Sequence, residues 1–175
     1  MIKQLSLAKA FAVLGVLLSC LLASMPLMAK EKVTLQLKWF HQFQFAGYYA
    51  AKEKGFFAEE GLDVEIRERD PNQTPSEAVL SGSADFGIAD TSLVLHRLQG
   101  KPLVVLAAIF QHSPLALMTL KESGIISPLE LKGKRVMFQR NVDDAALTAT
   151  FSEFGLKHDD IKHIPHNFKD DALTK

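Results

Sequence analysis

Cysteine, net charge and the common catalytic motifs are scarce or missing in this 175-residue chain. The single cysteine, Cys20, lies in an apolar N-terminal stretch, so the rest of the chain forms no disulfide, cysteine-ligated zinc site or catalytic thiol. The 20 Lys and Arg balance the 20 Asp and Glu, which gives no electrostatic case for binding nucleic acid. The composition, 47% hydrophobic and 23% charged, is that of an ordinary globular protein.

The signatures of nucleotide binding and hydrolysis are also absent. The chain has no P-loop, no GxGxxG, no GxSxG, no HExxH and no EF-hand loop. His163 and His166 are spaced three apart near Asp159 and Asp160, but Pro165 interrupts any helix that would align them on a metal. We therefore interpret that segment as a polar surface and predict no catalytic residue, metal or cofactor, which favours a binding protein over an enzyme.

The N-terminus has the layout of a secretory signal peptide. Lys3 and Lys9 precede an apolar run over residues 11–22, and a small residue, Ala29, stands before a charged stretch. We expect residues 1–29 to be a signal peptide cleaved after Ala29, with an uncleaved membrane anchor as the alternative; the membrane is involved only through that signal or anchor. Cleavage leaves 18 basic and 20 acidic residues, a net charge of −2.

Beyond the signal, short apolar or β-branched runs alternate with amphipathic stretches. This alternation is typical of an α/β protein with a mainly parallel sheet. The runs predict strands over residues 33–37, 62–67, 84–89, 103–110, 115–120 and 135–138, and helices over 46–54, 75–80, 91–99, 127–131 and 143–154.

A polar Gln-His-Ser-Pro stretch at residues 111–114 separates two apolar runs and is the predicted domain boundary. It divides the chain into a first α/β lobe, residues 30–113, and a partial second α/β lobe, residues 114–175. We expect the second lobe to be incomplete, because its tail from His158 shows no clear element and leaves a small sheet with open edges. A truncated fragment of a longer protein is one interpretation of this chain.

An aromatic loop from Trp39 to Tyr49 follows the first predicted strand. Ligands in open α/β sheets bind outside the carboxyl ends of the strands, where aromatic faces stack on planar rings. Trp39 and His41, at the strand exit, are the strongest candidates. Phe45 and Tyr48 are also candidates, although core packing explains rings in this loop equally well.

A second candidate position is Asp90, which follows the third predicted strand and fits the N-cap of the next helix. Its carboxylate and the Thr91 hydroxyl would face the same crevice, and the carboxylate favours a neutral or amino-bearing ligand over an anion. Capping alone accounts for Asp90 equally well. From the second lobe, Gln139 is the candidate that would reach the ligand.

The chain resembles a known family most densely over residues 38–92. The shared residues are Lys38-Trp39, Phe45 to Ala51, Lys54 to Phe57, Glu60 to Val64 and Gly82 to Ile88. They resemble the NMT1/THI5-like (SsuA/THI5-like) group of type 2 periplasmic binding proteins. The resemblance implies two α/β lobes that close over a small ligand and deliver it to an ABC permease.

On this basis we expect a periplasmic solute-binding domain for a small planar heterocycle, such as a thiamine pyrimidine precursor, feeding an ABC importer. One alternative is the periplasmic sensing portion of a longer signalling protein, with an attached signalling module as partner. Another is an enzyme that builds the thiamine pyrimidine from histidine and pyridoxal phosphate. The resemblance links that chemistry to a cysteine-rich segment and bound iron, and the missing cysteines argue against it.

Overall fold

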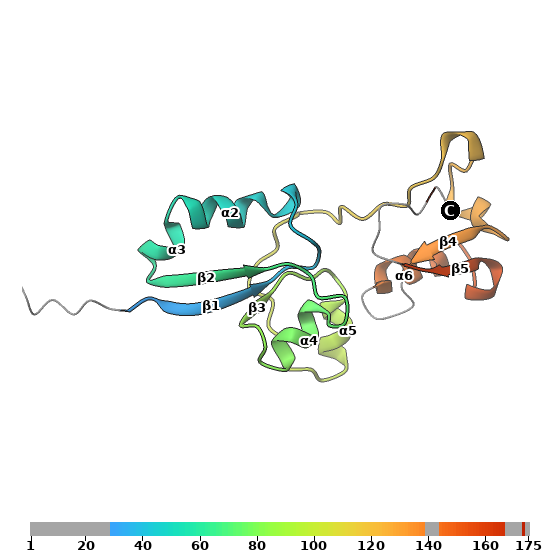
Figure 1. Cartoon of the computed structure of the whole chain (residues 1–175). Helices are drawn as coiled ribbons and strands as arrows, with labels where there is room; N and C mark the ends of the chain where they lie inside the picture. The colour runs from blue at the N-terminus through green and yellow to red at the C-terminus, as the bar shows by residue number, and fades with distance from the viewer. Residues whose placement is uncertain (1–28, 139–143, 167–172, 174–175) are drawn as a thin grey trace, which may run out of the picture.

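The computed structural model describes residues 29–138, 144–166 and 173. Its strands form two parallel sheets, one with the order β2-β1-β3 and one made of β4 and β5 (Figure 1). This confirms the predicted α/β class with parallel pairing. The boundary at residues 111–114 and the incompleteness of the second lobe stay predictions.

The predicted signal peptide lies almost wholly outside the described residues, which begin at residue 29. Within the described ranges, none of the helices has both the length and the apolar character that a membrane crossing requires. Cleavage and export therefore stay predictions as well.

The first sheet is centred on β1 (Glu31–Gln36). It pairs along its whole length with β2 (Leu62–Arg67), from Glu31 beside Leu62 to Gln36 beside Arg67. On its other edge it pairs with β3 (Phe86–Gly87). The third strand is shorter than the predicted range of 84–89 because the Asp85 carboxylate, at 2.7 Å, accepts the Thr34 N–H that a longer ladder would use.

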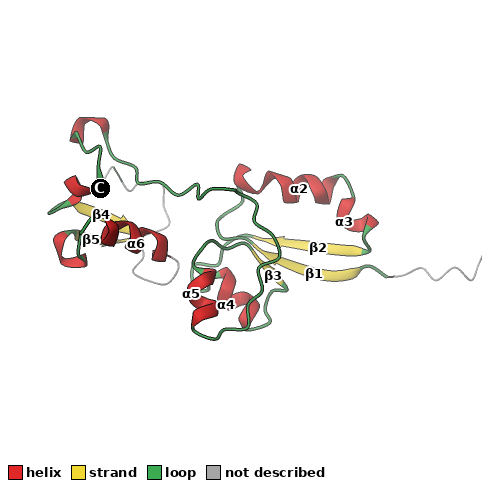
Figure 2. Ribbon diagram, turned by 180° about the vertical axis from the view of Figure 1, so that it is seen from behind, coloured by secondary structure: helices red, strands yellow, loops and turns green. Residues whose placement is uncertain are grey.

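Helices cover both faces of this sheet. α2 (Ala46–Glu53) and α3 (Phe56–Glu59) lie on one side, and α4 (Pro75–Leu80) and α5 (Leu93–Leu98) lie on the other (Figures 1 and 2). α4 begins as predicted, because the Thr74 side chain accepts from the Glu77 N–H while the Glu77 carboxylate accepts from the Thr74 N–H.

The core of the first sheet follows from the alternation in β1. Val33, Leu35 and Leu37 all point to the same side and are buried together with Phe45 and Val64. Leu37, at 0% exposure, anchors the chain where β1 ends. The aromatic loop, which begins at Trp39 and carries predicted ligand-binding residues, therefore follows a fully buried residue.

The second sheet is a β–α–β unit. β4 (Arg135–Phe138) is followed by α6 (Ala145–Glu153) and by β5 (Lys162–Pro165), which pairs in parallel with β4. The prediction that the tail after His158 forms no element was wrong. Only Ile161 and Ile164 are aliphatic in that strand region, and Ile161 is buried in a core with Leu131, Val136, Phe138, Phe151 and Leu156.

Two predicted strands, residues 103–110 and 115–120, do not form among the described residues. Leu103 is buried, but Val104, Leu106 and Ile109 are 77%, 72% and 66% exposed. A strand requires a paired backbone for its N–H and C=O groups, and no described strand pairs with this segment. The prediction from apolar content was therefore wrong for this structure, and the segment joins the two sheets as an irregular chain (Figure 2).

Candidate functional site

The candidate site lies at the carboxyl ends of β1, β2 and β3. The parallel ladder continues past the strands, since Leu37 N–H donates to Arg67 O at 2.8 Å and Arg69 N–H donates to Trp39 O at 3.0 Å. On the other edge, Ile88 N–H donates to Gln36 O at 2.9 Å. These bonds hold the residues that follow all three strands at one edge of the sheet.

Lys38 and Asp90 form an ion pair across that edge. Lys38 Nζ lies 3.1 Å from Asp90 Oδ2, and both side chains are largely buried, at 30% and 25% exposure. Asp90 Oδ1 also accepts the Ser92 N–H at 3.0 Å. Burial raises the pKa of the Asp90 carboxyl, but the hydrogen bonds from Ser92 and the charge of Lys38 outweigh it, so the pKa lies below its ordinary value.

The position of Asp90 differs from the predicted N-cap. α5 begins at Leu93 and its N-cap is Ser92, so the Asp90 carboxylate instead closes a turn two residues before the helix. Thr91 lies within that turn and its side chain is exposed. The turn leaves Asp90 free to pair with Lys38 while Thr91 faces outward.

Trp39 is a half-buried ring surrounded by polar and aromatic groups. The Arg69 guanidinium lies over the indole, with Cζ 5.8 Å from the ring centroid. The rings of Phe40 and His166 meet Trp39 edge-on, with centroid distances of 5.7 and 5.6 Å. These three neighbours fix the orientation of the indole, as a stacking platform requires.

His41 lies in the same loop but makes its own contacts. Its Nδ1 is 2.8 Å from the Tyr49 hydroxyl, and its backbone N–H donates to the Glu68 carboxylate at 3.4 Å. Desolvation and the Glu68 charge raise the pKa of Tyr49 above its ordinary value, so the phenol stays protonated and keeps its O–H donor. The imidazole remains exposed and open to a ligand.

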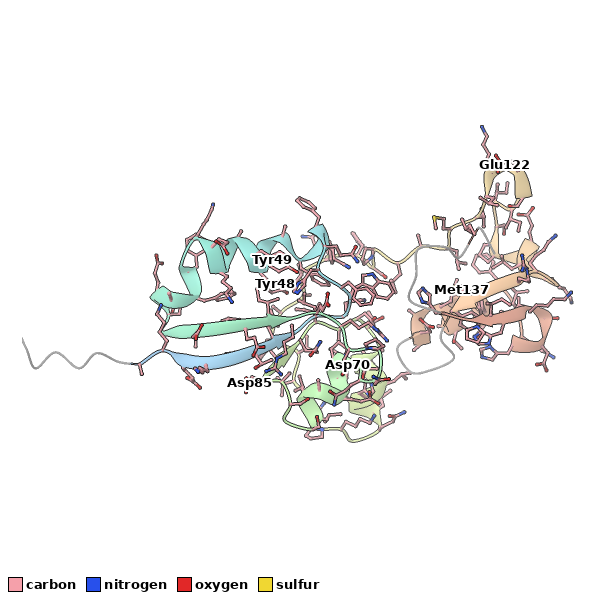
Figure 3. All side chains as sticks on the ribbon, in the orientation of Figure 1. Tyr48, Tyr49, Asp70, Asp85, Glu122 and Met137 are labelled. Atoms are coloured by element: carbon pink, nitrogen blue, oxygen red, sulfur yellow. The ribbon has the colours of Figure 1, made fainter. Side chains whose placement is uncertain are left out.

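Phe45 and Tyr48 occupy more internal positions than Trp39. Phe45 is 3% exposed and belongs to the core of the first sheet, which favours packing over ligand contact. Tyr48 is partly buried against the same core, and Tyr48 and Tyr49 both lie between α2 and β2 (Figure 3). Burial raises the pKa of Tyr48. Gln139, the candidate from the second lobe, lies outside the described residues.

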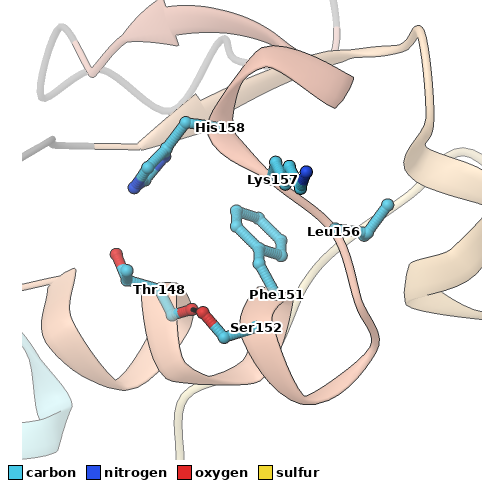
Figure 4. A pocket seen from close by; sticks show the side chains of 6 residues that line it. All are labelled: Thr148, Phe151, Ser152, Leu156, Lys157 and His158. Carbon is cyan, nitrogen blue, oxygen red and sulfur yellow. Dashed lines mark hydrogen bonds between the residues drawn. The ribbon is translucent and has the colours of Figure 1, made fainter.

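A surface pocket of about 240 Å³ lies apart from these residues, between α6 and the turn before β5 (Figure 4). It is smaller than the 300–1,000 Å³ typical of ligand clefts. The ring of Phe151, which is 2% exposed, forms its floor and is part of the core. The residues that line it are Thr148, Phe151, Ser152, Leu156, Lys157 and His158.

The described ranges contain no group of three His, Cys, Asp or Glu side chains placed to hold a metal ion. His163 lies 2.8 Å from the Phe138 carbonyl oxygen through its Nε2. His166 instead contacts Trp39. The two histidines therefore have separate surroundings.

Two site residues were missed by sequence reasoning, Arg69 and His166. Arg69 follows β2 just as Trp39 follows β1, so the rule that parallel strands place their carboxyl ends together could have identified it. His166 had no such signal, because the strand before it was not predicted.

Comparison with known proteins places these features in a family. Residues 42–175 match the family described as NMT1/THI5 like. A putative thiamine biosynthesis protein of Haemophilus influenzae is 27% identical over 150 residues, which cover 85% of this chain and 48% of that protein. A 4-amino-5-hydroxymethyl-2-methylpyrimidine phosphate synthase of Legionella pneumophila is 31% identical over 126 residues, 69% of this chain and 40% of the relative.

A third relative is named for binding. The riboflavin-binding protein RibY of Chloroflexus aurantiacus is 31% identical over 109 residues, 61% of this chain and 31% of that protein. This chain thus spans about half or less of the length of each of these curated relatives. Because the family match covers most of its length, the chain belongs to the NMT1/THI5-like family.

Proposed function

We propose that this chain is an exported binding domain for a small planar nitrogen heterocycle of the thiamine-pyrimidine class. The observation that carries the proposal is that Trp39 and the Lys38–Asp90 pair both follow strands of the first sheet at their carboxyl ends. Relatives named for thiamine pyrimidine synthesis and for riboflavin binding support a flat, nitrogen-containing ligand.

The residues of the site suit such a ligand chemically. The indole offers a large flat surface, and the Arg69 guanidinium over it fixes its orientation. The lowered pKa of Asp90 keeps its carboxylate ionised at neutral pH, so it can accept hydrogen bonds from an amino group or a ring N–H. Since Lys38 balances that charge, the pair recognises a polar neutral edge better than a free anion.

The proposed partner is the permease of an ABC importer in the bacterial envelope, which would receive the ligand from the periplasm. A sensing role in a longer signalling protein uses the same site, with an attached signalling module as the partner. Both roles require ligand binding without chemical change, and both are tested by the same binding experiment.

A synthase role is the second candidate, because several relatives carry that name. Such an enzyme would need a lysine to form a Schiff base with pyridoxal phosphate. Lys38 does not fit this need, since its amine already forms an ion pair with the Asp90 carboxylate at 3.1 Å. Incubation with pyridoxal phosphate followed by borohydride reduction tests it; a covalent adduct on Lys38 would support the synthase.

The binding proposal is tested by thermal melting of residues 30–175, the expected mature chain. The compounds are hydroxymethylpyrimidine, formylaminopyrimidine, thiamine, riboflavin and, as a non-planar comparison, taurine. A ligand at a hundred times its Kd adds about 2.7 kcal/mol to the free energy of unfolding. This corresponds to a rise in Tm of several degrees.

Two variants in the same loop make the test specific. Trp39→Leu should abolish the ligand-dependent rise in Tm. Phe43→Leu should keep that rise, because Phe43 is 91% exposed and does not belong to the core of the first sheet. A rise for a pyrimidine that survives in Trp39→Leu would contradict the assigned site. No rise for any planar compound would contradict the ligand class.

A further inference from the structure

The two sheets of this chain meet at the candidate site. Trp39 lies three residues beyond the end of β1, and His166 is the first residue beyond β5. Their ring centroids are 5.6 Å apart, with an interplanar angle of 83°. In β5 the register places Pro165 beside Phe138, so His166 leaves the carboxyl end of the second sheet.

The contact between Trp39 and His166 joins the carboxyl ends of the two sheets, where parallel sheets bind ligands. The carboxyl ends of the first sheet carry the Lys38–Asp90 pair and Trp39, and the carboxyl end of the second sheet carries His166. An imidazole perpendicular to the indole does not stack on it in parallel. Its ring nitrogens can instead donate to or accept from the polar edge of a flat molecule that stacks on Trp39.

The neighbouring histidine of β5 has a different role. His163 lies 2.8 Å from the Phe138 carbonyl oxygen and packs against the Phe138 ring, with a centroid distance of 4.7 Å. These contacts hold β4 and β5 together within the second sheet. His163 thus provides a matched control for His166, three residues away on the same segment.

We propose that His166 is the second sheet's contribution to the Trp39 site, so that both sheets build the site and His166 helps to select the ligand's polar edge. The identity of the ligand rests on the proposed function. The contact between His166 and Trp39 does not, and it can be measured without any ligand.

The experiment uses the fluorescence of Trp39, which is the only tryptophan of the 175-residue chain. A protonated imidazole quenches a neighbouring indole more strongly than a neutral one, and histidine titrates near pH 6.5. The emission of the purified full chain is followed from pH 8 to pH 5. The Arg69 guanidinium over Trp39 stays protonated over that range, so its charge on the indole is constant.

Three variants identify the histidine responsible. His166→Gln should lose the acid quenching, while His163→Gln should retain it. His41→Gln should also retain it, because the His41 ring faces Tyr49 at a centroid distance of 5.8 Å. Quenching that persists in His166→Gln, or that is absent from the unmodified chain, would overturn the proposal.

A binding measurement then tests ligand selection. For any planar compound that raises the Tm, His166→Gln should raise its Kd about tenfold, the equivalent of about 1.4 kcal/mol, and His163→Gln should leave it unchanged. An equal Kd in His166→Gln, or a lower one, would overturn the role in selection. If no compound binds, the proposed function fails, and the fluorescence titration alone decides whether both sheets build the site.

Discussion

Lys38 and Asp90 are 52 residues apart in sequence, yet their side chains meet at 3.1 Å because β1 and β3 are neighbours in one parallel sheet. The pair thus links the end of the central strand to the turn before α5, and it sets the electrostatic character of the candidate site.

The coupling between these two charges is measurable. A double-mutant cycle with Lys38→Met and Asp90→Asn should give a coupling free energy of about 1 kcal/mol, since the pair is largely shielded from water. The exposed pair Arg67–Glu65 is the control, and its cycle should show no measurable coupling. Equal coupling free energies for the two pairs would contradict the prediction that burial strengthens the Lys38–Asp90 pair. Chemical denaturation supplies the free energies.

Acid should weaken the fold partly through Asp90. Its pKa is lowered in the folded state, so the unfolded chain binds more protons as the pH falls through and below the ordinary Asp range. The stability that the carboxylate contributes is therefore present at neutral pH and is lost below about pH 4. Asp90→Asn should lower stability at pH 7 and flatten its dependence on acid pH.

The control for that titration is Asp63→Asn, which removes an exposed charge from β2. It should leave the acid limb unchanged. An acid limb in Asp90→Asn as steep as that of the unmodified chain would show that other carboxylates carry the effect. Urea unfolding at pH 3 to 7 provides the comparison.

Replacing glycine by alanine should have opposite effects on stability at Gly87, which is packed against α4, and at Gly47, which has open space around it. A Cβ on Gly87 would lie 3.1 Å from Pro75 O and 3.3 Å from Val79 Cγ2, so Gly87→Ala should cost about 1–3 kcal/mol of stability. Gly47, in α2, has open space around it, and Gly47→Ala should add up to about 1 kcal/mol. Thermal melting distinguishes them; a neutral Gly87→Ala would contradict the packing.

The exposed apolar segment after Leu103 should promote self-association. Val105→Lys combined with Ile109→Lys places charges at positions that are 60% and 66% exposed, so the Tm should change little while association at high concentration decreases. Val64→Lys, at 5% exposure, should instead prevent folding. Sedimentation velocity over a range of concentrations measures the association. Undiminished association in the double variant would show that the apolar segment does not drive it.

Local patterns predicted the first sheet well. The alternation of Val33, Leu35 and Leu37 located β1, and the predicted helix over residues 75–80 matches α4. These features depend on neighbours in sequence, which periodicity and capping chemistry describe directly.

Features that depend on distant backbone were harder to predict. Residues 103–110 have the composition of a buried strand, but composition does not supply the partner strand that a ladder needs. β5 was missed for the opposite reason, because its polar residues form a strand only through pairing with β4. At the candidate site, Trp39, His41 and Asp90 were predicted from their place after strands. Arg69 and His166, which follow β2 and β5, were not, and neither was the pairing of Asp90 with Lys38.

Each sheet of this molecule is built from one continuous stretch of sequence, β1 to β3 within residues 31–87 and β4 to β5 within residues 135–165. Among the described residues, every strand of the first sheet precedes those of the second. During synthesis, when a chain grows from its N-terminus at roughly 5–20 residues per second, the first sheet can close several seconds before β5 leaves the ribosome. The Trp39 platform is then complete before His166 exists to meet it, so the order of synthesis sets the order in which the two halves of the site form.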